Sequence, residues 1–125
     1  MRTPSPVVAA ADPAVTRRTC VDAVRAASDG LYVFNTQMAT LERAAARDDQ
    51  AALIHAATVI TNKFTELSAT LITLSRRPVS TSVRATLVKA SATVAGLGAV
   101  SYQGTPADQR AALTRVKASL VQACA

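Results

Sequence analysis

Apolar residues recur at alternating spacings of four and three residues in four stretches of the chain. The first two stretches run through Cys20, Val24, Ala27, Leu31, Phe34, Met38, Leu41 and Ala45, and through Leu53, Ala57, Ile60, Phe64, Leu67, Leu71 and Leu74. The other two hold Val83, Leu87, Ala90, Val94 and Leu97, and Leu113, Val116, Leu120 and Ala123. A mean period of 3.5 residues is typical of helices that pack along an apolar seam. The pattern therefore predicts four helices.

The seams also predict how these helices pair. Folding the chain near Asp49 places Leu31 opposite Leu67 and Phe34 opposite Phe64, as an antiparallel hairpin requires. The second and third stretches match in the same mirrored way, and so do the third and fourth. Three successive helical hairpins predict an all-α fold, an antiparallel up-down-up-down four-helix bundle.

Local signals set the expected ends of the helices. The first runs from about residue 15 to 47, and the second is capped by Asp48 or Asp49 and continues to about residue 76. The third opens at Ser80 or Thr81 and fades through the glycines of residues 96–104, and the fourth ends at about residue 123. The clearest signal is Thr105-Pro106-Ala107-Asp108, which combines a capping residue, a proline in the first turn and an acidic residue. Pro78 ends the second helix because the residue before a proline disfavours the α region. Gly30 is a candidate kink in the first helix.

Residues 1–14 are expected to lie outside the bundle formed by residues 15–125, as a disordered tail or the remnant of a signal peptide. They contain three of the five prolines and show no periodicity. The small apolar run at residues 7–11 is typical of the end of a secretory signal but is too short for a complete apolar region. A polar tail on a cytosolic protein is the alternative.

The two cysteines lie at Cys20, early in the first helix, and Cys124, at the end of the fourth. The predicted topology brings both to one end of the bundle, so we expect a disulfide and an oxidising compartment. Carried around the bundle, however, the seam register leaves them about six residues out of level, or ~9 Å at ~1.5 Å per residue. A disulfide needs Cα atoms within about 7 Å, so helix tilt, a slide of the fourth helix or a bend at Gly30 must close the gap. Two buried thiols are the alternative.

The chain is basic, with a net charge of +6 and a pI of about 10.2. The charge makes an anionic partner a candidate without naming one, since nucleic acid, anionic lipid and an acidic cell-envelope polymer would all be attracted alike. Another protein is the alternative candidate. Six arginines map to the end that bears both termini and are candidate contacts: Arg17, Arg18, Arg25, Arg76, Arg77 and Arg84. A solvated, helix-capping role is the alternative for this cluster. No apolar run reaches the ~20 residues of a membrane span.

The outer face of the second helix offers a second candidate contact surface. It is polar and almost uncharged, with Lys63 and Glu66 as the only charges between His55 and Arg76. An uncharged polar face costs less to desolvate than a charged one. Its hydroxyl and amide residues are Thr58, Thr61, Asn62, Thr65, Ser68, Thr70 and Thr73.

Residue types suited to catalysis or metal binding are sparse, and we expect no enzyme, no metal and no cofactor. His55, the only histidine, has no His, Cys or carboxylate three or four residues away. The Glu-x-x-His repeats of bundle metal sites and the c-type haem motif are both missing. Phe34, Met38 and Phe64 occupy neighbouring layers and are candidates to border a small ligand pocket, although simple core filling explains them too.

The sequence thus predicts a secreted or cell-envelope binding or interaction module that is not an enzyme, a monomer or weak homodimer of unknown partner. Two alternatives stay open. A carrier of a small apolar ligand predicts a cavity beside Phe34 and Phe64. A cytoplasmic cationic bundle that binds nucleic acid predicts free thiols and steeply salt-dependent binding.

Overall fold

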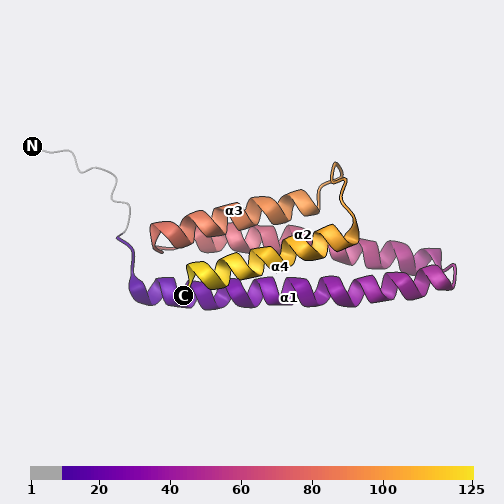
Figure 1. The fold of residues 1–125 in the computed structure, drawn as a ribbon, viewed down its shortest axis with the longest axis horizontal. Helices are drawn as coiled ribbons and strands as arrows, with labels where there is room; N and C mark the ends of the chain where they lie inside the picture. Colours follow the sequence, from indigo (N-terminus) through magenta and orange to yellow (C-terminus); the bar gives the residue numbers. More distant parts are fainter. Residues whose placement is uncertain (1–9) are drawn as a thin grey trace, which may run out of the picture.

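The chain folds into four α-helices, in a computed structural model that describes residues 10–125. They are α1 (Pro13–Ala46), α2 (Gln50–Ser75), α3 (Thr81–Leu97) and α4 (Pro106–Ala123). Consecutive helices pack antiparallel, and α4 returns to lie against α1 (Figure 1). The predicted up-down-up-down bundle is confirmed. Residues 1–9 of the predicted tail lie outside the described residues.

Capping side chains set the starts of the helices. Asp49, Ser80 and Thr105 precede α2, α3 and α4, and each side chain accepts a hydrogen bond from a backbone N–H of the first turn. Helix α1 begins at Pro13, two residues before its expected start, because Asp12 caps it. The N–H of Asp12 also donates to the carbonyl oxygen of Pro78 over 2.9 Å, which holds the start of α1 against the α2–α3 turn.

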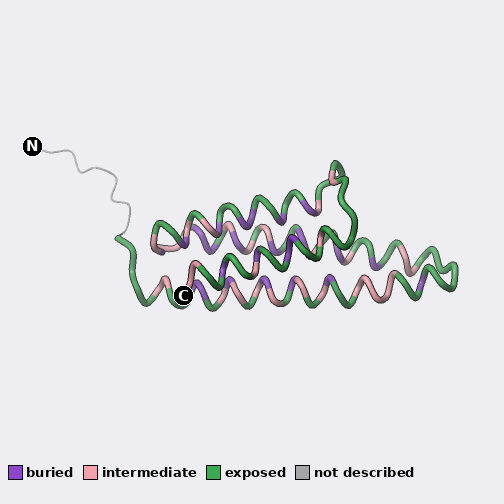
Figure 2. Tube along the Cα trace, in the orientation of Figure 1, coloured by how far each residue is buried: buried purple, intermediate pink, exposed green. Residues whose placement is uncertain are grey.

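The core is aliphatic and lies where all four helices overlap (Figure 2). Phe34 and Phe64 pack within it with ring centroids 5.9 Å apart, as the seam register predicted. Helix α1 continues through Gly30 as a single helix. A Cβ at Gly30 would lie only 2.8 Å from a methyl carbon of Leu67, so this glycine lets α1 and α2 approach closely.

Helices α1 and α2 are longer than α3 and α4, and their connected ends extend beyond the rest of the bundle (Figure 1). We call residues 39–59 the projecting hairpin. The predicted seam is wrong by one residue here, because Ala44 and Ala56 are completely buried while Ala45 and Ala57 are exposed. A straight helix has 3.6 residues per turn, so a seam of period 3.5 drifts around it by ~20° per heptad.

Cys20 and Cys124 form a disulfide with their Cα atoms 5.7 Å apart, which confirms the predicted bridge. The expected gap is closed by the position of α4. Arg110 donates to the side-chain oxygen of Asn35 over 2.7 Å, and its guanidinium lies 5.9 Å from the ring centroid of Phe34. The offset of about six residues expected from the seams would place Arg110 level with Thr40 instead. Helix α4 is thus displaced by about five or six residues, or ~8 to 9 Å, toward the start of α1.

The disulfide closes a loop with a sequence separation of 104. The double variant C20A/C124A is therefore expected to lose about 4 to 5 kcal/mol of unfolding free energy, as the chain-entropy model gives for a loop of ~100 residues. Urea denaturation followed by circular dichroism measures the loss. Dithiothreitol should produce a similar loss in the unmodified chain and none in the variant. A loss below ~1 kcal/mol would show that packing alone holds α4 in place.

Candidate functional site

The six arginines singled out from the sequence lie toward the end of the bundle where α1 begins and α4 finishes, which we call the arginine-rich end. The contact of Asp12 with Pro78 brings the start of α1 to the α2–α3 turn, and the disulfide brings the end of α4 to α1. The arginines of early α1 and those around the α2–α3 turn are thereby placed at one end of the bundle, beside the end of α4, although they are far apart in the sequence (Figure 1).

Two of these arginines bind to the protein itself. Arg77 donates to a carboxylate oxygen of Asp22 over 2.9 Å and to the hydroxyl of Thr19 over 3.4 Å, and so joins the α2–α3 turn to α1. Arg84 donates to the carbonyl oxygens of Ser75 and Arg77, at 3.0 and 3.2 Å. These carbonyls lie at the end of α2, where the helix itself supplies no donors. A capping role therefore accounts for Arg84, and an ion pair between the α2–α3 turn and α1 accounts for Arg77.

The other four, Arg17, Arg18, Arg25 and Arg76, have exposed side chains. Arg17 and Arg25 border a shallow hollow of about 810 Å³ between α1 and α4, beside the disulfide. The hollow is lined by three valines. Val24 is half-buried, whereas Val21 and Val121 are 55% and 50% exposed. This arrangement presents apolar surface between two cations that are able to pair with carboxylate or phosphate groups.

The displacement of α4 creates this hollow. In the register expected from the seams, Val121 lies level with Asp29, more than one helical turn beyond Val24. In the structure the disulfide places the end of α4 beside the early turns of α1, and Val121 joins Val21 and Val24. Sequence reasoning missed the valines because the register of α4 was wrong. The available signal was that Val21 and Val121 are apolar residues directly beside seam positions.

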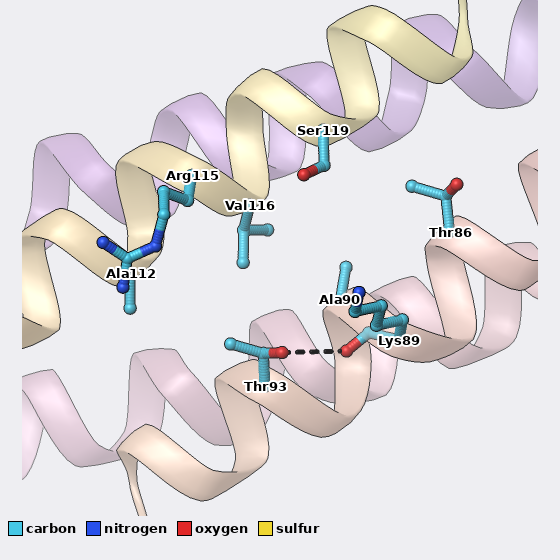
Figure 3. A pocket seen from close by; sticks show the side chains of 8 residues that line it. All are labelled: Thr86, Lys89, Ala90, Thr93, Ala112, Arg115, Val116 and Ser119. Carbon is cyan, nitrogen blue, oxygen red and sulfur yellow. Dashed lines mark hydrogen bonds between the residues drawn. The ribbon is translucent and has the colours of Figure 1, made fainter.

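A second hollow, of about 330 Å³, lies between α3 and α4 (Figure 3). Ala90, Ala112 and Val116 are its buried lining, and their small size leaves the space between the helices. Lys89 and Arg115 supply one cation from each helix, a pair that sequence reasoning missed. The hydroxyl of Thr93 donates to the carbonyl oxygen of Lys89 over 3.0 Å. This hollow therefore combines two cations with a small apolar floor of alanine and valine side chains.

The predicted polar face of α2 is partly buried. The hydroxyl of Ser68 donates to the carbonyl oxygen of Ser91 on α3, and that of Ser91 donates to the carbonyl oxygen of Ser68, at 3.0 and 2.8 Å. Lys63 also lies at an interface, since its side chain is 17% exposed and pairs with Asp29 of α1 and with Glu66. The prediction was therefore wrong for Ser68 and Lys63. The hydroxyl and amide residues that stay exposed are Thr58, Thr61, Asn62, Thr65 and Thr73.

The remaining candidates have these positions. Phe34 and Phe64 are buried and Met38 is half-buried, and the hollows described above lie elsewhere; the core ligand pocket stays a prediction. His55 is exposed on the projecting hairpin. Within residues 10–125, no three His, Cys, Asp or Glu side chains gather into a group that could hold a metal ion. No helix in this range is long and apolar enough to cross a membrane.

Comparisons of the chain with protein-family models, with curated proteins and with solved structures gave no significant match. The chemistry of the surface is therefore the basis for a functional proposal.

The two roles of the arginines can be separated by mutation. R84M removes the donors to two carbonyl oxygens at the end of α2 and is expected to lower the unfolding free energy by about 1 to 2 kcal/mol. R76M changes an exposed side chain and is expected to alter it by less than ~0.5 kcal/mol. Urea denaturation of the two variants measures both values, and equal effects would contradict the division.

Lys63 should make the stability depend on pH at the alkaline end. Burial lowers the pKa of Lys63, but the hydrogen bonds and charges of Asp29 and Glu66 outweigh burial and raise it above its ordinary value of 10.5. The unfolded chain then releases the proton first. Stabilisation by the charged amine is complete below pH 10.5 and is lost as the pH rises through the folded-state pKa.

We therefore expect the unmodified chain to exceed K63M in unfolding free energy by a constant amount from pH 7 to 10. The difference should shrink above pH 10.5, as measured by urea denaturation in a pH series. K89M, a change at an exposed lysine, is the matched control and should show no such trend. A difference for K63M that stays constant beyond pH 12 would contradict the role of the ion pair.

Proposed function

We propose that the protein is an exported, non-enzymatic binding module that holds an anionic segment of a partner protein in the hollow between α1 and α4. The observation that carries the proposal is the coincidence of exposed Val21 and Val121 with the exposed arginines Arg17 and Arg25 around one depression. A partner segment that presents apolar side chains flanked by carboxylates matches the apolar lining and the charge of this surface.

Export is supported by the disulfide. Disulfides form and persist in oxidising compartments and are rare where glutathione and thioredoxin keep thiols reduced. The bridge between Cys20 and Cys124 borders the hollow directly. The proposed binding surface would therefore be assembled only in an oxidising environment.

Rough magnitudes favour a partner with apolar side chains. Covering the exposed halves of Val21 and Val121 would contribute roughly 1 kcal/mol each, from about 1.5 to 3 kcal/mol for a fully buried side chain. Ion pairs at an exposed rim contribute about 0.2 to 1 kcal/mol each. The valines thus supply most of the affinity, and Arg17 and Arg25 supply orientation and a faster association.

A nucleic-acid strand fits this surface less well. Proteins that bind single strands stack the bases on aromatic side chains, and no residue that lines the hollow is aromatic. The valine side chains also have no charge and no hydrogen-bond donor with which to bind sugars or phosphates. The polar surface of an acidic polysaccharide has the same disadvantage.

The test uses a synthetic helical peptide with leucines on one face, flanked by glutamates, titrated into the isotopically labelled protein. We expect amide chemical-shift changes around Val21, Val24 and Val121. R17E/R25E should weaken binding at least ~10-fold, equivalent to about 1.4 kcal/mol. R43E/R47E makes the same charge change at exposed residues of the projecting hairpin and its turn, and should alter binding less than ~2-fold.

Two further probes separate the alternatives. A single-stranded oligonucleotide that binds more tightly than the peptide, with a steep salt dependence, would replace the proposal with nucleic-acid binding. A small apolar ligand that shifts the signals of Phe34 and Phe64 would favour the carrier. A peptide that binds without shifts at the three valines would overturn the proposed site.

A further inference from the structure

The projecting hairpin leaves part of the bundle's apolar seam without a covering helix. Helix α3 finishes near Phe64, where a Cβ on Gly98 would lie 3.0 Å from the Cβ of Phe64. The first turns of α4 lie beside Phe34 of α1, since the guanidinium of Arg110 is 5.9 Å from the ring centroid of Phe34. Beyond these two phenylalanines, α1 and α2 continue as a pair by themselves (Figure 1).

The apolar spacing of the sequence nevertheless continues into this pair, although the residues buried between its two helices are Ala44 and Ala56. The residues at that spacing are Met38, Leu41 and Ala45 on α1, and Leu53 and Ala57 on α2. None of these five is buried, whereas the α2 seam from Ile60 to Leu74 is buried throughout (Figure 2). Ile54, adjacent in sequence, is 66% exposed. Met38, Leu41 and Leu53 are half-buried, and the first two pack against the core. The exposed parts of these side chains, with Ala45 and Ala57, form an apolar strip ~10 Å long on this pair.

In the rest of the bundle, two antiparallel helices, α3 and α4, pack over the apolar side of α1 and α2. A partner for the projecting hairpin should therefore also be a pair of antiparallel helices. The projecting hairpin of a second copy is such a pair and carries the same spacing of apolar residues. We propose that two copies of this chain pair through their projecting hairpins about a two-fold axis. Each hairpin then takes the place that α3 and α4 would occupy if they were longer, which extends the four-helix packing across both copies.

Charge supports contact at this end of the molecule. The projecting hairpin carries three acidic and two basic side chains: Glu42, Arg43, Arg47, Asp48 and Asp49. The start of α4, which the hairpin of a second copy would approach, adds Asp108 and Arg110. This end is nearly neutral in a chain of net charge +6, so two copies approach here without the repulsion expected between two arginine-rich ends. Mixed signs also suit a surface that must complement itself.

The α3–α4 loop adds a second contact. In the two-fold arrangement the turn of each hairpin would approach this loop in the other copy. Val100 in the loop is fully exposed, and the arrangement would shield it. The surfaces remain small, about two helix widths by ~10 Å, below the ~1,000 Å² of total area that stable interfaces bury. We therefore expect a weak dimer that exchanges with the monomer.

Sedimentation equilibrium of the oxidised, full chain between about 10 µM and 1 mM tests the proposal. The unmodified protein should show a reversible monomer–dimer equilibrium. A45E/A57E introduces like charges that would meet across the two-fold axis, and should weaken the dimer at least ~10-fold. A85E/A118E makes the same change at exposed alanines of α3 and α4 and should change the Kd less than ~2-fold. All four positions are exposed on helices, so circular dichroism should show folded chains throughout.

Three outcomes would overturn the proposal. The chain could stay monomeric up to ~1 mM, which would leave this face for a different protein. The dimer could persist in A45E/A57E, or weaken equally in the control variant, and either result would place the contact elsewhere. The proposal does not rest on the binding function of the α1–α4 hollow, because R17E/R25E should leave the dimer unchanged.

Discussion

The disulfide between Cys20 and Cys124 sets the position of α4 along α1, and the surface of the protein follows from that position. Aliphatic seams pack almost equally well in several registers, because a shift of one heptad replaces one set of similar side chains with another. A covalent bond with a Cα separation of 5.7 Å removes that freedom at one end of the helix. The contact of Arg110 with Asn35 and Phe34 is made in the same register further along.

Two surface features depend on this register. Val121 lies beside Val21 and Val24 only because α4 is displaced toward the start of α1, so the apolar hollow is a product of the displacement. The same displacement, with the short length of α3 and α4, leaves the far ends of α1 and α2 uncovered. One constraint thus creates the hollow at the basic end of the molecule and contributes to the uncovered seam at the nearly neutral end.

Small residues at the helix contacts allow the helices of the bundle to approach one another closely. Gly30 lies against Leu67, Ala44 and Ala56 are buried in the projecting hairpin, and Ser68 and Ser91 exchange hydrogen bonds with each other's backbone. The serine pair shows why a polar residue on a predicted outer face can be buried. Each hydroxyl donates a hydrogen bond to a backbone carbonyl oxygen of the other helix. Neither side chain therefore pays the free-energy cost of an unpaired polar group between the helices.

The sequence by itself determined the four helices, their order, their caps and the pairing of Phe34 with Phe64, because periodicity and capping act over a few residues. It also brought Cys20 and Cys124 to one end. Only the tertiary structure decided the register of α4 and the division of the arginines into bonded and exposed side chains. It also decided the partial burial of Ser68 and Lys63 and the full burial of Ala44 and Ala56. These depend on how far each helix slides and rotates against its neighbours. A small error in the register predicted for one helix pair adds to that of the next pair. The apolar pattern along a single helix therefore does not determine the position of α4 against α1.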